Sequence, residues 1–78
     1  MYGECTVQDR ATFRAMRISR GMDRKALAEA ASVSYQTTKR AETGCPITAK
    51  NAVALAAALQ VPFETVWRII PIGGDVQA

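Results

Sequence analysis

The sequence predicts an all-α domain, and three observations point to that class. Ala52, Leu55, Ala56 and Leu59 fall at i, i+3, i+4 and i+7, the spacing of one buried helix face. No segment of useful length alternates Val, Ile or Thr with polar residues, as a half-buried strand does. The hydrophobic content is 49% and much of it is alanine, which excludes a disordered chain and favours closely packed helices. At 78 residues the chain is one domain with a modest core, so self-association is expected.

Residues 1–7 show no periodic pattern and are expected to form an irregular N-terminal arm, followed by a first helix over residues 8–20. Gly21 is expected to end this helix, because glycine readily adopts the left-handed backbone found after helices. Within the helix, Arg17 shares a face with the apolar Phe13. A guanidinium buried without a partner is prohibitively unstable. Arg17 therefore either pairs with a carboxylate or extends its charged end into solvent.

Two short helices are expected over residues 23–44, joined by a tight turn. Asp23 and Ser34 are good N-caps for them, since their side-chain oxygens accept hydrogen bonds from free backbone N–H groups. The second of these helices is rich in hydrogen-bonding side chains, and only Thr38 and Ala41 suit a core. A helix this polar is usually a solvated surface. Its amide and guanidinium groups also match the edges of DNA bases, so we expect this helix to be presented to DNA.

Thr48 is expected to cap a fourth helix, the one with the alanine and leucine stripe. Pro62 begins a fifth helix and Pro71 ends it, with an apolar face made by Phe63, Val66, Trp67 and Ile70. The C-terminal tail, residues 71–78, contains two glycines and is expected to be flexible unless a partner orders it. This end offers more apolar surface than so small a domain needs. We therefore expect a dimer contact here, made by Trp67, Ile69, Ile70 and Ile72. The alternative is that Trp67 closes the core while the isoleucines divide between core and solvent.

Several classes of protein are disfavoured by what the sequence lacks. There is no histidine, and Cys5 and Cys45 are too few thiolates for a structural zinc site, so no metal is expected and both cysteines are interpreted as free thiols. No paired carboxylates or phosphate-binding glycine loop suggests an enzyme, a cofactor or a small-molecule ligand. No apolar run is long enough for a membrane span, and no signal peptide is apparent, so the expected location is the cytoplasm, in association with the nucleoid. The net charge of +3, with seven arginines among ten basic residues, is compatible with a nucleic-acid partner.

Four segments between residues 13 and 66 follow the pattern of a known family. They are F-R-A-M-R-x-x-R-G-M, D-R-K-A-L-A-E-A-A, V-S-x-x-T-x-x-x-x-E-x-G and A-L-A-A-A-L-Q-V-P-F-E-T-V. In this register, without insertions, they resemble the Cro/phage-repressor helix-turn-helix family, also called XRE-type or lambda-repressor-like. The resemblance implies a compact five-helix DNA-binding domain over residues 8–70, with the helix-turn-helix formed by the two helices of residues 23–44.

The resemblance also implies roles for individual residues. Base edges in the major groove would be contacted by Tyr35, Gln36, Lys39 and Arg40, with Tyr35 equally suited to a protein contact. Phosphates would be bound by Arg24, Ser34, Thr37, Thr43 and Lys50. Arg17 and Glu42 match a paired arginine and glutamate, which would supply the carboxylate that a buried Arg17 needs. The chain departs from the family pattern at Ser32, where glycine is usual, and at Thr38 and Ala41, where larger aliphatic residues are usual.

These features favour a sequence-specific transcriptional regulator that binds double-stranded DNA as a homodimer, because one helix contacts only a few base pairs. The alternative is a protein-interaction module on the same scaffold, such as an antitoxin or a co-regulator that acts with a protein partner. Ile18, on an otherwise polar helix face, and the apolar C-terminal segment motivate this alternative.

Overall fold

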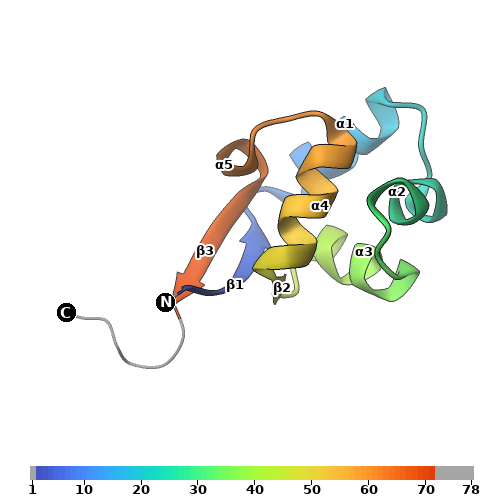
Figure 1. Ribbon diagram of the computed structural model, residues 1–78. Helices are drawn as coiled ribbons and strands as arrows, with labels where there is room; N and C mark the ends of the chain where they lie inside the picture. The colour runs from blue at the N-terminus through green and yellow to red at the C-terminus, as the bar shows by residue number, and fades with distance from the viewer. Residues whose placement is uncertain (1, 72–78) are drawn as a thin grey trace.

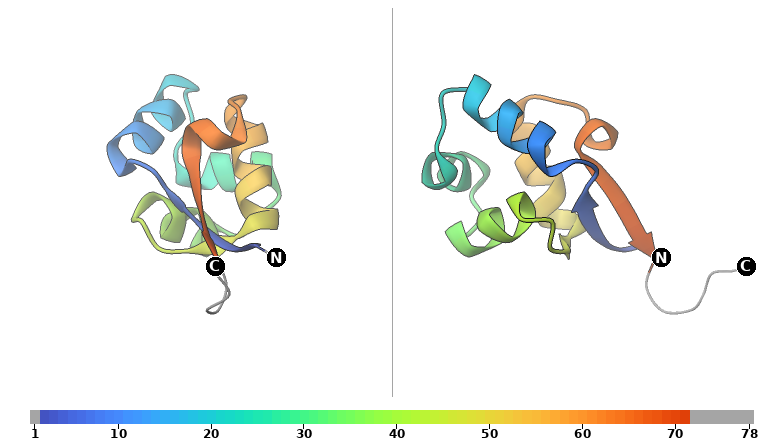
Figure 2. Two further views of the ribbon diagram at one scale, coloured as in Figure 1. Left: turned by 90° about the vertical axis from the view of Figure 1, so that its left-hand side faces the viewer. Right: turned by 180° about the vertical axis from the view of Figure 1, so that it is seen from behind.

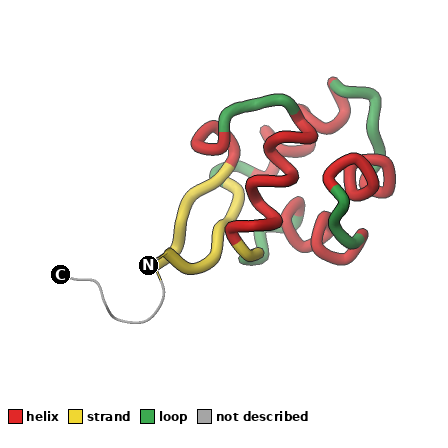
Figure 3. Tube along the Cα trace, in the orientation of Figure 1, coloured by secondary structure: helices red, strands yellow, loops and turns green. Residues whose placement is uncertain are grey.

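The computed structural model describes residues 2–71 of the 78-residue chain. Its helices are α1 (Arg10–Ser19), α2 (Arg24–Ala31), α3 (Tyr35–Glu42), α4 (Ala49–Leu59) and α5 (Phe63–Val66). Its strands are β1 (Tyr2–Val7), β2 (Ile47–Thr48) and β3 (Trp67–Pro71). The described chain is thus mostly helical, with the five predicted helices, but it also contains a small sheet (Figure 1; Figure 3).

The sheet shows that the strictly all-α prediction was wrong, and that the N-terminal arm expected to be irregular is strand β1. The strand order is β2-β1-β3, and both pairings are antiparallel. Cys5 lies opposite Ile47 on one side and Ile69 on the other. The partners of β1 are therefore about 40 and 60 residues away in the sequence. A short segment whose pairing is so distant gives little local signal, which is why a sequence pattern does not reveal it.

The fifth helix is also shorter than predicted, because it ends at Val66 and the chain continues as β3. Gln8 fixes this change of conformation. Its backbone N–H donates to the carbonyl of Val66 at 2.9 Å, and its side-chain amide donates to the carbonyl of Trp67 at 3.0 Å. The apolar spacing of this region fits a helix, but the adjacent β-branched Ile69 and Ile70 suit a strand, and here they pair with β1 opposite Cys5 and Glu4.

The core lies where α4 packs against α2, β1 and α5. The stripe predicted on α4 is buried at all four positions, Ala52, Leu55, Ala56 and Leu59. Figure 1 shows α4 running between the sheet on one side and helices α2 and α3 on the other. Two further views show β1 and β3 side by side, with α1 beginning directly beyond β1 (Figure 2). Among the helices within residues 2–71, none has the length and apolar character needed to cross a membrane.

Hydrogen bonds confirm the N-caps predicted for α2 and α4. Asp23 accepts from the N–H of Ala26 at 2.8 Å, and Thr48 accepts from the N–H of Asn51 at 3.3 Å. Gly21 follows α1 with a φ of 71°, as expected of a glycine that ends a helix. These interactions fix where α2 and α4 begin.

Candidate nucleic-acid interface

Helix α3 has two different faces. Thr38, Ala41 and Glu42 point inward and are buried, with exposed fractions of 0%, 0% and 6%. The four predicted base-contacting residues all lie on the opposite, exposed face: Tyr35, Gln36, Lys39 and Arg40. They occur as two pairs spaced four residues apart, so they form two adjacent rows along one helix surface. The structure therefore brings these four side chains together on the solvent side of α3.

The N-terminal end of α3 is formed by Ser34. Its hydroxyl oxygen accepts from the N–H of Thr37 at 3.0 Å, and its hydroxyl lies 2.8 Å from Oγ1 of Thr37. Both residues were predicted to bind phosphate, and both lie at this exposed helix end, with Thr37 half-buried. Ser32, in the preceding turn, has φ 58° and ψ 39°. Ser32, at a position where the family pattern usually has glycine, thus adopts the left-handed conformation that carries strain in a non-glycine residue.

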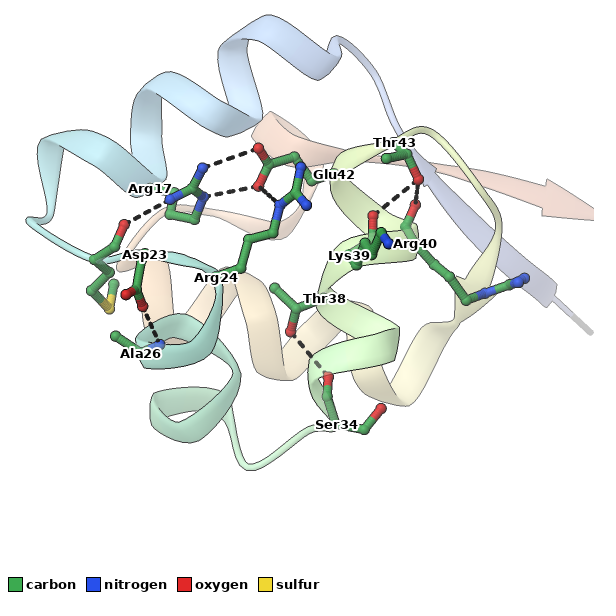
Figure 4. A network of polar contacts seen from close by, with 11 residues as sticks. Arg17, Asp23, Arg24, Ala26, Ser34, Thr38, Lys39, Arg40, Glu42 and Thr43 are labelled. Carbon is green, nitrogen blue, oxygen red and sulfur yellow. Dashed lines mark hydrogen bonds and ion pairs between the residues drawn. The ribbon is translucent and has the colours of Figure 1, made fainter.

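The C-terminal end of α3 is held by a buried ion pair. Arg17 donates from Nε and Nη2 to the two carboxylate oxygens of Glu42, at 2.8 and 3.0 Å, and from Nη1 to the carbonyl of Met22 at 2.9 Å (Figure 4). The predicted Arg17–Glu42 pair is therefore confirmed, and Arg17 is only 8% exposed. Burial alone raises the pKa of Glu42, but the hydrogen bonds from Arg17 and Arg24 outweigh it, so the pKa lies below its usual value. Glu42 is consequently ionised at neutral pH and joins α3 to α1.

Arg24, at the start of α2, contributes a second cation to this carboxylate. Its Nε lies 3.4 Å from Oε1 of Glu42, and the side chain is half-buried. Glu42 first and then Tyr35 raise the pKa of Arg24. The sequence predicted Arg24 as a phosphate ligand and gave no sign of its contact with Glu42. A guanidinium has five N–H donors, so this contact leaves others available for phosphate.

Two more predicted contact residues lie just beyond α3. Thr43 is exposed, and its hydroxyl donates to the carbonyl of Lys39 at 2.9 Å. Lys50 is exposed in the first turn of α4. Arg40 extends toward the loop between α3 and β2, where its Nη2 donates to the carbonyl of Pro46 at 3.3 Å. Arg40 therefore already makes a contact within the protein that a base contact would have to replace or share.

Comparison with known proteins identifies the family. A family model described as Helix-turn-helix matches residues 13–66. The chain belongs to this Cro/repressor-like (XRE-type) helix-turn-helix family. The match spans α1 to α5, including α2, the turn at Ser32 and α3. Membership supports a DNA-binding protein of transcription regulation rather than an enzyme.

A solved structure shares the fold of this helix-turn-helix protein. The crystal structure of the transcriptional regulator VanUg superposes with a TM-score of 0.63 and 18% sequence identity, over 91% of each chain. At this identity the likeness concerns the fold alone. No curated protein sequence matches the chain.

The predicted dimer residues fall in different environments in the helix-turn-helix protein. Trp67 is only 2% exposed and packs against Phe13 with ring centroids 5.7 Å apart, so it belongs to the core and its assignment to a dimer contact was wrong. Ile69 and Ile70 are 47% and 38% exposed. As successive strand residues they point to opposite faces of the sheet. Ile72 lies outside the described residues.

Sequence reasoning missed a row of arginines on α1. Arg10 and Arg14 line an open groove between α1 and the C-terminal end of α3, into which Glu42 and Arg24 also face. The sequence does indicate this row, because Arg10, Arg14 and Arg17 are spaced i, i+4 and i+7 and so share one helix face. The helix-turn-helix protein thus has basic groups beside α3 as well as on it.

Proposed function

We propose that this protein is a sequence-specific transcriptional regulator of the Cro/repressor type that places α3 in the major groove of DNA. The observation that supports this most directly is the division of α3 into a buried face and an exposed face of Tyr35, Gln36, Lys39 and Arg40. The only acidic side chain of α3, Glu42, is turned inward and neutralised by two arginines, so it does not repel phosphate. Glutamine and arginine are suited to the edges of adenine and guanine respectively.

The proposed phosphate ligands surround this exposed face. Ser34 and Thr37 lie at the start of α3 and Thr43 lies at its end, while Arg24 and Lys50 belong to the first turns of α2 and α4. Ser34, Thr43 and Lys50 are exposed, whereas Arg24 and Thr37 are half-buried. Groups at helix N-termini suit phosphate, because the backbone N–H groups and the helix dipole both favour an anion. These residues would set the position of α3 on the duplex, and the exposed face would select the sequence.

We also infer that the regulator acts as a homodimer on an operator with two half-sites. Strand β3 is at the edge of the sheet, since the order is β2-β1-β3. An edge strand presents backbone groups that can pair with a second strand, and here Ile69 and Ile70 flank that edge. Two copies joined through β3 would carry two α3 helices, one for each half-site. The proposed location of such a regulator is the cytoplasm, at the nucleoid.

The dimer is tested by sedimentation equilibrium of the whole chain and of Ile69→Lys. A lysine on an edge strand opposes strand pairing, so the variant should dissociate at concentrations where the parent is dimeric, with unchanged circular dichroism. A parent protein that stays monomeric at tens of micromolar would contradict the proposal.

A protein-interaction module is the second candidate function. Its specific support is Ile18, which is 55% exposed on α1 beside the groove that contains Glu42. An exposed isoleucine close to a polar rim is compatible with a protein contact. Recovery of a stoichiometric protein partner without retained DNA would favour this candidate over a stand-alone DNA-binding regulator.

Selection from random duplex oligonucleotides tests the leading proposal and would give the operator, its symmetry and its half-site spacing together. Gln36→Ala and Arg40→Ala should each weaken operator binding by about 1–3 kcal/mol and relax preference at one base position. Lys50→Ala serves as the contrast, because loss of a phosphate contact should weaken all sequences alike and reduce the salt slope by about one. If Gln36→Ala and Arg40→Ala leave the selected sequence unchanged, α3 does not determine specificity.

A further inference from the structure

Two open grooves on the surface of the protein join at the C-terminal end of α3. The first, of about 560 Å³, lies between α1 and α3 and is lined by Arg10, Arg14 and Arg24. The second, of about 480 Å³, lies against the sheet and is lined by Thr6 and Arg68. Asp9, Arg10 and Thr43 line both, so the two grooves adjoin. We call the two adjoining grooves together the α1–sheet groove.

The charge of the α1–sheet groove is strongly positive. Its two carboxylates already have partners. Glu42 is paired with Arg17 and Arg24, and Asp9 caps α1 by accepting from the N–H of Ala11 and the hydroxyl of Thr12. Within residues 2–71, its remaining cations have no ion-pair partner; these are Arg10, Arg14 and Arg68. Four arginines, Arg10, Arg14, Arg24 and Arg68, thus line the α1–sheet groove against the two carboxylates Asp9 and Glu42, and this excess of positive charge favours an anionic ligand.

Thr6 supplies a separate indication of a ligand. It lies opposite Arg68 in the sheet, on the face turned away from its buried neighbours Cys5 and Val7. Thr6 is only 8% exposed, and its hydroxyl has no hydrogen-bond partner in the described part of the chain. A buried hydroxyl without a partner is unusual, and Thr6 lines the groove beside Arg68 and Arg10. Because the hydroxyl oxygen itself is buried, an anion oxygen in the groove would accept the missing hydrogen bond after the neighbouring side chains shift.

Gly44 explains how Arg10 comes to lie across the end of α3. A Cβ atom on Gly44 would lie 3.2 Å from Cδ of Arg10, closer than such contacts ordinarily are. A side chain at this position would require the Arg10 side chain to shift by a few tenths of an ångström, so Gly44 leaves room for Arg10 beside the loop that follows Thr43. Because Thr43 is also on the exposed side of α3, Arg10 brings a positive charge to the border of the proposed DNA-contacting face.

We propose that the α1–sheet groove binds backbone phosphates of the DNA strand that passes the C-terminal end of α3. Arg10, Arg14 and Arg68 are the cationic contacts, and Thr6 donates a hydrogen bond to a phosphate oxygen. This inference rests on the proposed function, and it extends the DNA footprint from the helix-turn-helix onto α1 and the sheet. The contacts would be independent of base sequence, because phosphates are the same at every position.

The salt dependence of binding to the selected duplex tests the proposal. Each phosphate contact contributes about 0.9 to the slope of log K against log salt, so R10Q/R68Q should lower the slope by about 1.8 and weaken operator and random duplex alike. The conservative variant R10K/R68K should largely retain the slope. Arg20→Gln is the matched control, because Arg20 is an exposed arginine at the other end of α1, where its Nε donates to the carbonyl of Leu59 at 3.1 Å. The salt slope of Arg20→Gln should equal that of the parent protein.

Duplexes with single methylphosphonate linkages locate the contact. A neutral linkage at the phosphate contacted by Arg10 or Arg68, on the flank of the α3 site, should weaken the parent protein and leave R10Q/R68Q unaffected, and circular dichroism verifies that each variant is folded. If the double variant does not fold, Arg10→Gln and Arg68→Gln are measured separately, each with an expected loss of about 0.9 in slope. A folded variant with an unchanged slope overturns the groove while leaving the proposed function intact. A parent protein that binds no duplex DNA at all refutes the proposed function and this inference together.

Discussion

Replacement of Glu42 by alanine should destabilise the protein severely. Glu42 and Arg17 are 6% and 8% exposed, and the carboxylate receives two hydrogen bonds from Arg17 and the nearby charge of Arg24. Removal of one partner of a buried pair leaves an uncompensated charge and costs about 3–5 kcal/mol. A domain of this length has a free energy of unfolding of about 4–12 kcal/mol. The variant should therefore lose a large share of its stability, and a fall in Tm of more than about 10 °C is expected.

Urea unfolding followed by circular dichroism, with Trp67 fluorescence as an independent probe, measures this loss. The double variant R17M/E42L is the matched control. It removes both charges and fills the space with apolar side chains, so it should regain most of the stability that E42A loses. If E42A costs less than about 1 kcal/mol, or if R17M/E42L is as unstable as E42A, the contact between Arg17 and Glu42 does not hold α3 in the way the geometry indicates.

Two further predictions concern pH and backbone strain. The folded-state pKa of Glu42 is below its usual value, so its stabilising contribution is complete above about pH 4.3 and is lost as the pH falls through the lower folded-state value. Urea unfolding below that pH should show that the free energy of unfolding of Glu42→Gln changes less with pH than that of the parent, by at most about 1.4 kcal/mol per pH unit. If the free energies of the two proteins change with pH in parallel, Glu42 is not the group responsible. Ser32→Gly should raise the free energy of unfolding by about 1 kcal/mol, because Ser32 has a left-handed φ of 58°. Gln60, at the end of α4, has a φ of 61°, so Gln60→Gly should give a similar gain that adds to the first. A loss of stability in either glycine variant would show that the serine or glutamine side chain matters more than the strain.

The helix ends around the site could be predicted from the sequence, because they depend on local chemistry. Asp23, Ser34 and Thr48 each cap the helix that follows, since the capping hydrogen bond spans only two or three residues and depends on side-chain type. The Arg17–Glu42 contact spans 25 residues, yet it was predictable because two arguments agree. A guanidinium on an apolar helix face requires a carboxylate, and the family pattern supplies one.

The sheet could not be predicted in this way, because its pairings join distant segments. Nothing local to residues 2–7 indicates that Val7 will lie opposite Trp67. The segment from Phe63 to Ile70 has apolar residues at helical spacing, and short apolar runs fit helix and strand equally. Tertiary context decides the outcome here, since Trp67 fills the core beside Phe13 only when the chain leaves the helix at Val66.

The position of Arg24 links the stability of the protein to its proposed contact with DNA. Its Nε faces Glu42 at 3.4 Å, while the half-buried side chain also lines the α1–sheet groove. A phosphate that approaches Arg24 from the groove would therefore meet a guanidinium already oriented by Glu42, and less side-chain freedom would be lost on binding. Glu42 in turn is held by Arg17, so the end of α3, the head of α2 and the face of α1 share one carboxylate. A single buried acid thus positions both the helix proposed to select the sequence and the arginine proposed to bind the backbone.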